Sequence, residues 1–388
     1  MSKEVPDRLI KLKDPHRLLY VVNAAWFFIS HRLPLAEAAK QMGYEVHIAA
    51  GTATAEEIQL LENSGFRFHQ LGLRRASGNP VHNIVLLLQL LRIYRLVRPR
   101  IVHHVTIKPV ILGTLIARVL GIHAVVNAVS GLGYSFSKTD ARRRSLRYFV
   151  GLAYRICLRH PRMTVIFQNP DDRLDFTAWT GLKSINNILI AGSGVDTDRF
   201  HPTPEPSGLV RVVLPARMLR DKGVVEFAVA VGRLRASGIL FDALLSGGLD
   251  PENPESLTEP ELRALENQYG VRWIGNCSDV AALFSQTHIV CLPSYREGLP
   301  KVLMEASAAG RAIVTTDVPG CRHVVTDGVT GILVPPRQFE PLAASIGRLI
   351  ADADMRRRLG TAARLRAERE YGVDRIVAKT LDLYSAIA

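Results

Sequence analysis

The sequence predicts an α/β protein built from two doubly wound domains, and three observations support this prediction. The chain has 388 residues, enough for two domains that each bury a core. Apolar runs of strand length alternate with helix-like segments in two series, the pattern of parallel sheets covered by helices. A stretch rich in Gly and Pro, 192–206, separates the two series. We therefore expect an amino-terminal domain over 1–195, a linker over 196–206 and a carboxy-terminal domain over 207–370.

The first series accounts for the amino-terminal domain. Short apolar runs mark its strands, and longer periodic segments, several of them ended by Gly, mark its helices. The expected strands are 18–22, 45–50, 66–71, 101–104, 124–128, 165–169 and 188–191, and the expected helices are 33–42, 55–64, 81–97 and 110–120. Ligands of parallel sheets bind at the carboxyl ends of the strands, so the loops to consider are 23–32, 103–109 and 130–135.

The second series repeats this alternation after the linker. Its expected strands are 210–215, 241–246, 271–274, 288–292, one after Gly310 and one that ends at 335. Its expected helices are 223–237, 279–286, 301–309, 341–351, 355–370 and 373–387.

The stretch 289–320 carries the clearest chemical signal. A buried strand leads into a loop and then into a helix over about 301–309, with Pro300 suited to its first position. Glu297 lies in the loop and Glu305 about a turn and a half into the helix. The amide groups of a helix N-terminus attract phosphate, and carboxylates can hold hydroxyl groups. A sugar nucleotide carries both groups, whereas an ordinary exposed helix residue is the alternative interpretation of Glu305.

The segment 294–306, Ser-Tyr-Arg-Glu-Gly-Leu-Pro-Lys-Val-Leu-Met-Glu-Ala, closely resembles the donor-binding signature of family 4 retaining glycosyltransferases of GT-B fold. In that family the glutamate at the position of Glu305 holds the ribose diol of the nucleotide. The glutamate at the position of Glu297 contacts the transferred sugar. The other residues of the signature that the resemblance assigns to the donor are Gly298, Leu299 and Pro300.

The resemblance extends over about 18–388 and implies an architecture. Two Rossmann-like domains would face each other across a cleft, with the donor on the carboxy-terminal domain and the acceptor on the amino-terminal one. The last helix, within 371–388, would cross back to the amino-terminal domain.

The segment 216–223, Ala-Arg-Met-Leu-Arg-Asp-Lys-Gly, follows a strand and opens a helix. The family places an Arg and a Lys here to hold the donor diphosphate, and Arg217 and Lys222 match them. The nucleoside diphosphate gains negative charge as the glycosidic bond breaks, so nearby cations favour the transition state. Cations at a helix N-terminus are otherwise disfavoured, which indicates a bound anion. Arg220 is expected to be solvated.

Two glycine-containing turns complete the expected donor site. Gly247, at the end of a strand, resembles the glycine turn that the family places near the donor. The loop with Asn276 and Cys277 resembles the base-binding loop, where backbone atoms would read the base. A purely structural turn would have the same sequence, and this alternative stays open.

The amino-terminal loops supply the residues expected at the acceptor. Many family members carry a histidine near the reacting sugar, and Ser130 stands at that place here, which excludes a histidine base. This departure suits front-face return, in which the departing phosphate takes the acceptor proton. His31 is the expected alternative polar group at the cleft, and one of His103 and His104 is expected to face the cleft. The expected acceptor-binding residues are Arg32, Lys108, Ser130 and Gly131.

Positive charge is concentrated in one part of the chain. The net charge is +13, and between Asn63 and Pro170 the sole acid, Asp140, stands against 17 Lys and Arg. In 142–162, arginines alternate with aromatic and aliphatic residues, as in helices that lie in a membrane interface. A surface helix packed on its own domain is the alternative. No helix-turn-helix, zinc-finger or RNA-stacking motif occurs, so an anionic membrane surface is favoured over nucleic acid.

Other features of the sequence exclude several classes of protein. No window of 18 apolar residues predicts a membrane-spanning helix, and the first residues lack the apolar core of a signal peptide. Four cysteines without metal spacing indicate a reducing compartment. Two Asp-x-Asp sequences, 196–198 and 352–354, fall in the linker and on a surface helix, so we expect no metal and no cofactor. The predicted location is the cytoplasm, with peripheral attachment to the inner face of the cell membrane.

Further segments resemble a subgroup of the family. These segments, 29–34, 75–80, 131–133 and 250–254, are similar in bacterial enzymes that add N-acetylgalactosamine, or a related sugar, to a polyprenyl-diphosphate-linked saccharide. The resulting hypothesis is retaining transfer of an N-acetylhexosamine or hexose from a UDP-sugar to such an acceptor, in surface polysaccharide or glycan assembly. The alternatives are a GT-B enzyme with a soluble acceptor and a basic, non-enzymatic protein that binds nucleotides or nucleic acid.

Overall fold

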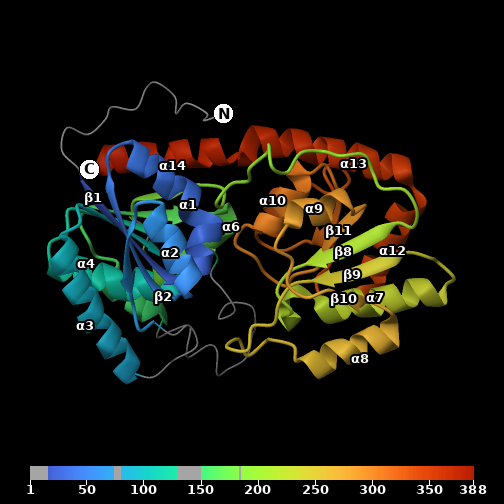
Figure 1. The fold of residues 1–388 in the computed structure, drawn as a ribbon, viewed down its shortest axis with the longest axis horizontal. Helices are drawn as coiled ribbons and strands as arrows, with labels where there is room; N and C mark the ends of the chain where they lie inside the picture. Colours follow the sequence, from blue (N-terminus) through green and yellow to red (C-terminus); the bar gives the residue numbers. More distant parts are fainter. Residues whose placement is uncertain (1–15, 74–79, 130, 132–149, 183–184) are drawn as a thin grey trace. The chain divides into compact units, whose positions relative to one another are not determined.

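The computed structural model describes residues 16–73, 80–129, 131, 150–182 and 185–388. The chain forms two compact units: unit 1 comprises Met1–Ser193 and Ile376–Ala388, and unit 2 comprises Gly194–Arg375. Each unit contains one parallel sheet flanked by helices (Figure 1). The predicted α/β class with two doubly wound sheets is therefore confirmed.

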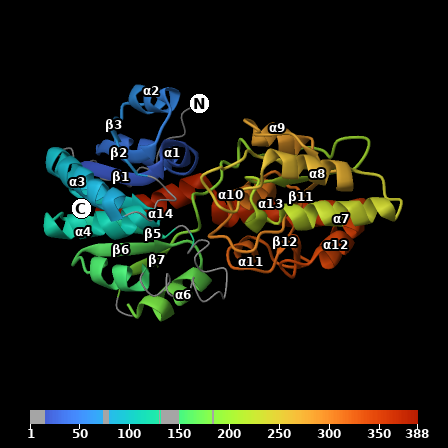
Figure 2. The same cartoon turned by 90° about the horizontal axis from the view of Figure 1, so that it is seen from below.

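The sheet of unit 1 has seven strands in the order β3-β2-β1-β4-β5-β6-β7, and all its neighbouring strands are parallel. Figure 2 shows this order, from β3 at one edge to β7 at the other. The order 3-2-1-4-5-6 of the first six strands is that of doubly wound nucleotide-binding folds. The strands are β1 (Arg17–Ala24), β2 (Glu45–Thr52), β3 (Arg67–Gln70), β4 (Ile101–Val105), β5 (Ala124–Val129), β6 (Met163–Phe167) and β7 (Asn187–Leu189).

Helices cover both faces of this sheet because successive strand residues point to opposite faces. In β1, Leu18, Tyr20 and Val22 belong to the core under α1 and α14, whereas Leu19 and Val21 belong to the core under α3 and α4. The helices of unit 1 are α1 (Ala25–Gln41), α2 (Ala55–Asn63), α3 (Pro80–Val97), the π-helical turn η1 (Pro109–Gly113), α4 (Thr114–Val119), a helical segment that includes 150–157, α6 (Pro170–Thr180) and α14 (Val373–Ile387).

The sheet of unit 2 has six strands in the order β10-β9-β8-β11-β12-β13, again with parallel neighbours. Its strands are β8 (Arg211–Pro215), β9 (Asp242–Ser246), β10 (Arg272–Trp273), β11 (Ile289–Leu292), β12 (Ala312–Thr316) and β13 (Ile332–Val334). Its helices are the 3-10 turn η3 (Arg220–Lys222), α7 (Val224–Ala236), α8 (Glu259–Tyr269), α9 (Val280–Ser285), α10 (Lys301–Ala308), α11 (Cys321–Val324), α12 (Phe339–Ala351), α13 (Ala353–Arg366) and the π-helical turn η4 (Ala367–Tyr371).

The boundary between the units differs from the predicted linker. The segment 196–206 is part of unit 2, where Val195 pairs with Gly372 and the ring of Phe200 lies 6.2 Å from that of Phe284. The end of the chain returns to unit 1, because α14 buries Ile376, Leu381 and Tyr384 in the same core as β1.

The first helix was predicted too short. We expected a helix over 33–42 preceded by a loop, whereas α1 already begins at Ala25 and contains Pro34. A proline inside a helix removes one backbone hydrogen bond. Ala25 and Phe28 are fully buried, and their contacts with the core outweigh this loss.

Two of the helices that were not predicted have readable caps. The helix α8 follows the capping box of Thr258 and Glu261, and α6 follows the capping side chain of Asn169 with Pro170 at its first position. Each helix buries few apolar side chains, Leu262 in α8 and Phe176 in α6, so no long apolar stripe marks either helix in the sequence.

Candidate active site

The segment with the strongest sequence signal forms β11, a loop and α10 in unit 2. Pro300 is the N-cap of α10 rather than its first residue, with an extended ψ of 115°. Leu299 beside it is 8% exposed. Glu305 is also only 8% exposed, so it is not the solvent-facing helix residue of the alternative interpretation.

Glu297 receives two short hydrogen bonds. Lys222 donates from Nζ to Glu297 Oε1 at 2.5 Å, and Ser294 donates from Oγ to the same oxygen at 2.7 Å. The side chains of Lys222 and Glu297 are 17% and 13% exposed. A charge pair that is this well shielded from water fixes the orientation of both groups.

The loop that carries Glu297 is fastened to the start of α7. The backbone N–H of Tyr295 donates to the carbonyl of Asp221 at 2.9 Å, and the Tyr295 hydroxyl donates to Glu226. The guanidinium of Arg337 also lies 4.5 Å from the Tyr295 ring centroid. These contacts hold Glu297 and Lys222, which come from distant parts of the sequence, in one place.

The three cations of the segment 216–223 have carboxylate partners. Besides Lys222, Arg217 pairs with Asp250, whose side chain is 8% exposed, and Arg220 pairs with Glu261. Neighbouring carboxylates thus offset the charge of these cations, and the bound anion that the sequence indicates at this place stays a prediction. Arg220 is exposed, as expected, but it is ion-paired rather than simply solvated.

The two glycine-containing turns lie side by side. The backbone N–H of Gly247 donates to the carbonyl of Gly275 at 2.7 Å, and the indole N–H of Trp273 donates to the carbonyl of Gly247 at 2.8 Å. Asn276 is exposed next to Gly248, and the Cys277 thiol donates to the carbonyl of Asp279. The predicted glycine turn and base-binding loop thus form one edge of unit 2.

Burial changes the acidity of two carboxyl groups here. It raises the pKa of Glu305, and the ammonium group of Lys301, 3.4 Å from Glu305 Oε1, partly offsets the effect. Burial also raises the pKa of Asp221, whose Oδ1 has no hydrogen-bond partner among the described residues. Both groups are thus poised to respond to a ligand that brings donors or positive charge.

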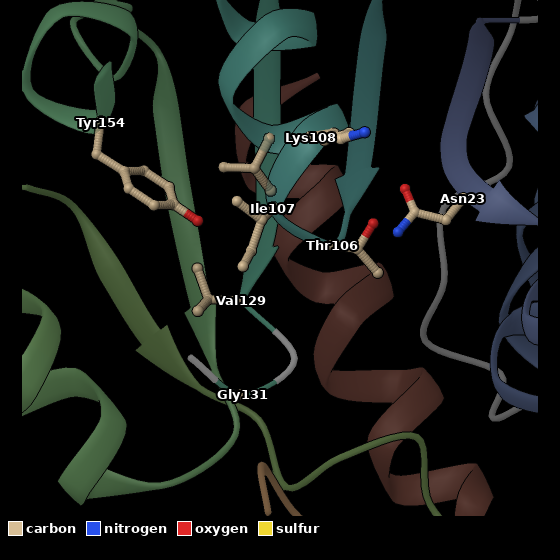
Figure 3. Close-up of a pocket in the computed structure, with 8 residues that line it drawn as sticks. Asn23, Thr106, Ile107, Lys108, Val129, Gly131 and Tyr154 are labelled. Carbon is tan, nitrogen blue, oxygen red and sulfur yellow. The ribbon is translucent and has the colours of Figure 1, made fainter. Parts of the chain in front are cut away.

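Unit 1 contains a cavity of about 340 Å³ at the carboxyl ends of β1, β4 and β5 (Figure 3). Lys108 and Gly131, two of the predicted acceptor-binding residues, line it together with Asn23. Burial lowers the pKa of the Lys108 amine. Ser130, another predicted acceptor-binding residue, lies outside the described residues.

The predicted role of Arg32 at the acceptor does not agree with its position. Arg32 lies on α1 and is 6% exposed, near the hydroxyl groups of Tyr20 and Tyr384, and burial lowers its pKa. Its guanidinium is therefore inside unit 1 rather than available to a ligand. The neighbouring His31 is half-buried on the same helix, where its ring stacks on Phe27 at 4.2 Å and its Nδ1 lies 2.6 Å from Ser30 Oγ.

The expectation that His103 or His104 faces a cleft is wrong. The two residues are 1% and 0% exposed. His103 Nδ1 lies 2.5 Å from the hydroxyl of Tyr384, and His104 contacts the hydroxyl of Tyr94 at 2.7 Å and Oδ1 of Asn127 at 2.7 Å. Burial lowers the pKa of both imidazoles, that of His104 to about 4, so they are neutral core residues.

The two Asp-x-Asp sequences serve as local caps. Asp196 Oδ1 accepts hydrogen bonds from the backbone N–H groups of Asp198 and Arg199, and Asp352 caps α13 by accepting from the N–H of Met355. These contacts account for both sequences without a ligand.

Several residues of the site escaped the sequence analysis. Asp250 and Ser294 were present in the motifs that we quoted, but their partners lie far away in sequence. Gly320, at φ 85°, follows β12, and a Cβ there would lie 2.6 Å from the carbonyl oxygen of Glu297. Its one signal was the Pro-Gly dipeptide, which marks a turn but not what packs against it.

Comparison with known proteins agrees with this geometry. A family model described as "Glycosyl transferase 4-like" matches residues 17–169, in unit 1. A family model described as "Glycosyl transferases group 1" matches residues 196–366, in unit 2.

Curated relatives include a glycan transferase and a sugar-phosphate synthase. The N,N'-diacetylbacillosaminyl-diphospho-undecaprenol alpha-1,3-N-acetylgalactosaminyltransferase of Campylobacter jejuni is 25% identical over 384 residues, which cover 96% of this chain and 99% of that protein. The alpha-maltose-1-phosphate synthase of Mycobacterium tuberculosis is 30% identical over 224 residues, which cover 52% of this chain and 57% of that protein.

Solved structures show the same fold across nearly the whole chain. Sucrose-phosphate synthase from Thermosynechococcus elongatus matches with a TM-score of 0.77 at 18% identity, covering 96% of this chain and 99% of that one. Anabaena HepE in complex with UDP-glucose matches with a TM-score of 0.76 at 16% identity, covering 95% and 99%. The two sheets, the two family models and these matches together lead to one conclusion: the chain belongs to the glycosyltransferases of GT-B type, with a 4-like domain in unit 1 and a group 1 domain in unit 2.

Proposed function

We propose that this glycosyltransferase moves an N-acetylhexosamine or hexose from a UDP-sugar to a polyprenyl-diphosphate-linked saccharide, with retention of configuration. The observation that carries the proposal is the cluster in unit 2 in which Lys222 and Ser294 orient the Glu297 carboxylate. The Campylobacter relative, by its name, uses a lipid-diphosphate-linked acceptor, and HepE has been solved with UDP-glucose. Neither a metal nor a cofactor is part of the proposal.

The side chains of unit 2 have distinct roles in this proposal. The Glu305 carboxylate accepts hydrogen bonds from the ribose diol, since an ionised carboxylate is an acceptor of two or more such bonds. Arg217 and Lys222 balance the charge that develops on the leaving diphosphate. Glu297 contacts the hydroxyls of the transferred sugar while Lys222 and Ser294 hold it in position.

The proton transfer follows front-face return. The acceptor hydroxyl oxygen forms a bond to the anomeric carbon on the face from which the diphosphate departs. The electron pair of the breaking carbon–oxygen bond goes to the β-phosphate, and the acceptor proton goes to an oxygen of that phosphate. This route needs no histidine at position 130, and His31 remains the proposed alternative group for a proton.

The Glu305→Gln variant tests the assignment of the donor site. Glutamine keeps the shape but loses the charge, so we expect UDP affinity to fall about tenfold to a hundredfold, as for a lost charge-assisted hydrogen bond. Calorimetry with UDP measures it, and Glu340→Gln, an exposed acid on α12, serves as the control. Equal UDP affinity of Glu305→Gln and the parent would contradict the assignment.

Peripheral membrane attachment is the second part of the proposal. No helix among the described residues is long and apolar enough to span a bilayer. One face of α3, however, exposes Val81, Ile84, Val85 and Leu88, which are 43–63% exposed, and continues with exposed Arg92 and Arg95. The spacing i, i+3, i+4, i+7 places the four apolar residues on one stripe.

Neighbouring helices extend this surface. The helix α4 packs against α3 and exposes Arg118 and Val119, and the segment 150–157 exposes Leu152, Arg155 and Ile156. All three helices pack on the same face of the sheet through their opposite sides. Apolar side chains between arginines suit the interface of an anionic bilayer.

Vesicle sedimentation tests the surface with a single substitution. Leu88→Glu places a negative charge in the stripe, so binding to vesicles that contain phosphatidylglycerol should fall at least tenfold at low salt. Leu240→Glu, at a 79% exposed position of unit 2, is the matched control and should bind as the parent does. If the parent does not bind these vesicles, membrane attachment is wrong and an enzyme with a soluble acceptor is favoured.

A further inference from the structure

The cavity of unit 1 has the size and position of a site for one sugar residue. It measures about 340 Å³, near the lower end of the roughly 300–1,000 Å³ that ligand pockets occupy. Its lining comes from the carboxyl ends of three neighbouring strands and from the segment 150–157 (Figure 3). The lining residues that the structure describes all belong to unit 1, so the chemistry of the cavity is argued from that unit.

The lining has a polar side and an apolar side. In Figure 3 the side chains of Asn23, Thr106 and Lys108 gather on one side, and Tyr154 and Val129 lie on the other. The apolar side chains that line the cavity are Ile107, Val110, Val129 and Tyr154. Val110, Val129 and Tyr154 are 0%, 3% and 1% exposed, so this wall is a fixed part of the core.

Two buried oxygen atoms of the polar side lack hydrogen bonds. Among the described residues, neither Asn23 Oδ1 nor Thr106 Oγ1 has a partner. Buried polar atoms almost always form hydrogen bonds, so these two oxygen atoms indicate a ligand that supplies the missing partners. The amide oxygen of Asn23 accepts hydrogen bonds only, whereas the hydroxyl of Thr106 can also donate.

The backbone at Thr106 is held in an unfavourable conformation. Its φ is 77°, in the left-handed region, which a β-branched residue adopts very rarely. The residue stands between the end of β4 and the π-helical turn η1. Strained residues and π-helical turns both concentrate at functional sites, where the surrounding fold maintains them.

We propose that this cavity binds the acetamido group of an N-acetylated sugar in the acceptor saccharide. The acetamido N–H donates to Asn23 Oδ1, its carbonyl oxygen accepts from the Thr106 hydroxyl, and its methyl group packs against Val110 and Val129. Lys108 lies at the polar side and binds a hydroxyl of the same sugar. The proposal rests on the proposed function and specifies the chemical class of its acceptor.

A diphosphate group fits the same cavity less well. A phosphate oxygen would face the Asn23 carbonyl oxygen, which repels it, and among the described residues of the lining Lys108 is the one cation. The four apolar side chains would contact no part of a diphosphate. An acetamido group, in contrast, supplies an N–H donor for Asn23 Oδ1, a carbonyl oxygen for the Thr106 hydroxyl and a methyl group for the apolar side chains.

Ligand-observed NMR on the full chain tests the cavity without turnover. Methyl N-acetyl-α-glucosaminide and methyl α-glucoside differ in the acetamido group, and saturation transfer to the acetamido methyl reports its burial. We expect the N-acetyl glycoside to bind at least tenfold more tightly. Asn23→Ala and Thr106→Val should each weaken it at least tenfold, whereas Asn63→Ala, at an exposed position on α2, should not.

The Asn23→Asp variant distinguishes binding of an acetamido group from binding of a diphosphate. Aspartate keeps the accepting oxygen, so binding of the N-acetyl glycoside should persist within about threefold of the parent. Equal binding of the two glycosides, or displacement of the N-acetyl glycoside by inorganic pyrophosphate, would overturn the proposal. Thermal melting and UDP affinity, which depends on unit 2, show whether each variant is folded.

A transfer assay distinguishes this inference from the proposed function. Farnesyl-diphosphate-linked N-acetylglucosamine and glucose serve as paired acceptors, and we expect at least a hundredfold preference in kcat/KM for the former, lost in Asn23→Ala. Equal transfer to both acceptors would overturn the inference and leave the function standing. Transfer to neither, together with selective binding by NMR, would refute the function and support the cavity's assignment.

Discussion

Lys222→Ala is expected to lower kcat/KM by a factor of about 10² to 10³, the usual effect of removing one preorganised group that stabilises transition-state charge. Lys222 Nζ lies 2.5 Å from Glu297 Oε1, and both side chains are largely shielded from water. Its loss removes a cation from the leaving diphosphate and leaves Glu297 with Ser294 as its orienting donor. Steady-state transfer with saturating acceptor measures the effect.

Arg220→Ala is the matched control for this experiment. Arg220 lies two positions away and is paired with Glu261 at an exposed site, where ion pairs contribute little. We expect its kcat/KM to stay within about threefold of the parent.

The double variant Lys222→Ala, Glu297→Gln tests whether the two groups act as a unit. Its decrease in kcat/KM should then be much smaller than the product of the two single decreases. Full turnover in both single variants would contradict the assignment.

Gly247→Ala is expected to damage both the stability of unit 2 and donor binding. A Cβ at this position would overlap the carbonyl oxygen of Ala216, a backbone atom next to Arg217. To remove this overlap, the end of β8 must move away from the turn at Gly247, which should lower the free energy of unfolding by about 3 kcal/mol. For a domain of this size the midpoint temperature should fall by about 6–12 °C. UDP affinity should fall at least tenfold, because Arg217 and the turn around Gly275 would both shift.

Gly248→Ala provides the matched control at the next residue. A Cβ there would meet no atom closer than the Asn276 Cβ, at 3.9 Å, which is an ordinary contact. Its melting temperature should change by less than about 2 °C. Calorimetric scans of the two variants compare them directly. If Gly247→Ala and Gly248→Ala behave alike, the close approach to Ala216 does not constrain the site.

Much of the candidate donor site could be predicted from local sequence. The strand, loop and helix around Glu297 and Glu305 follow from an apolar run, a loop rich in Pro and Gly, and a helical period, all within about 30 residues. The helix at 301–308 and the strand at 289–292 were therefore confirmed, and α10 ends within one residue of its predicted end. The pairing of Lys222 with Glu297, 75 residues apart, had no such local signal.

The acceptor side was harder to read because its residues depend on burial. His103, His104 and Arg32 are polar residues near the ends of predicted elements, which made them candidates for a site. The structure places all three inside unit 1, where Tyr384 of the last helix contacts His103 and lies near Arg32. Asn23 and Thr106 carried no comparable signal, since an unpaired oxygen atom and a positive φ are properties of the folded backbone.

The sequence by itself determined the α/β class and the two alternating series, because periodicity and turn residues act over a few positions, and its resemblance to the family indicated the residues of the candidate donor site. Only the tertiary structure decided which carboxylate pairs with each cation, which histidines are buried and where a cavity forms in unit 1. Neighbouring strands in a parallel sheet are joined by long crossovers, so residues that share a site come from distant segments. The burial and pairing of these residues depend on which strands are neighbours in the sheet, and local sequence patterns do not specify that order.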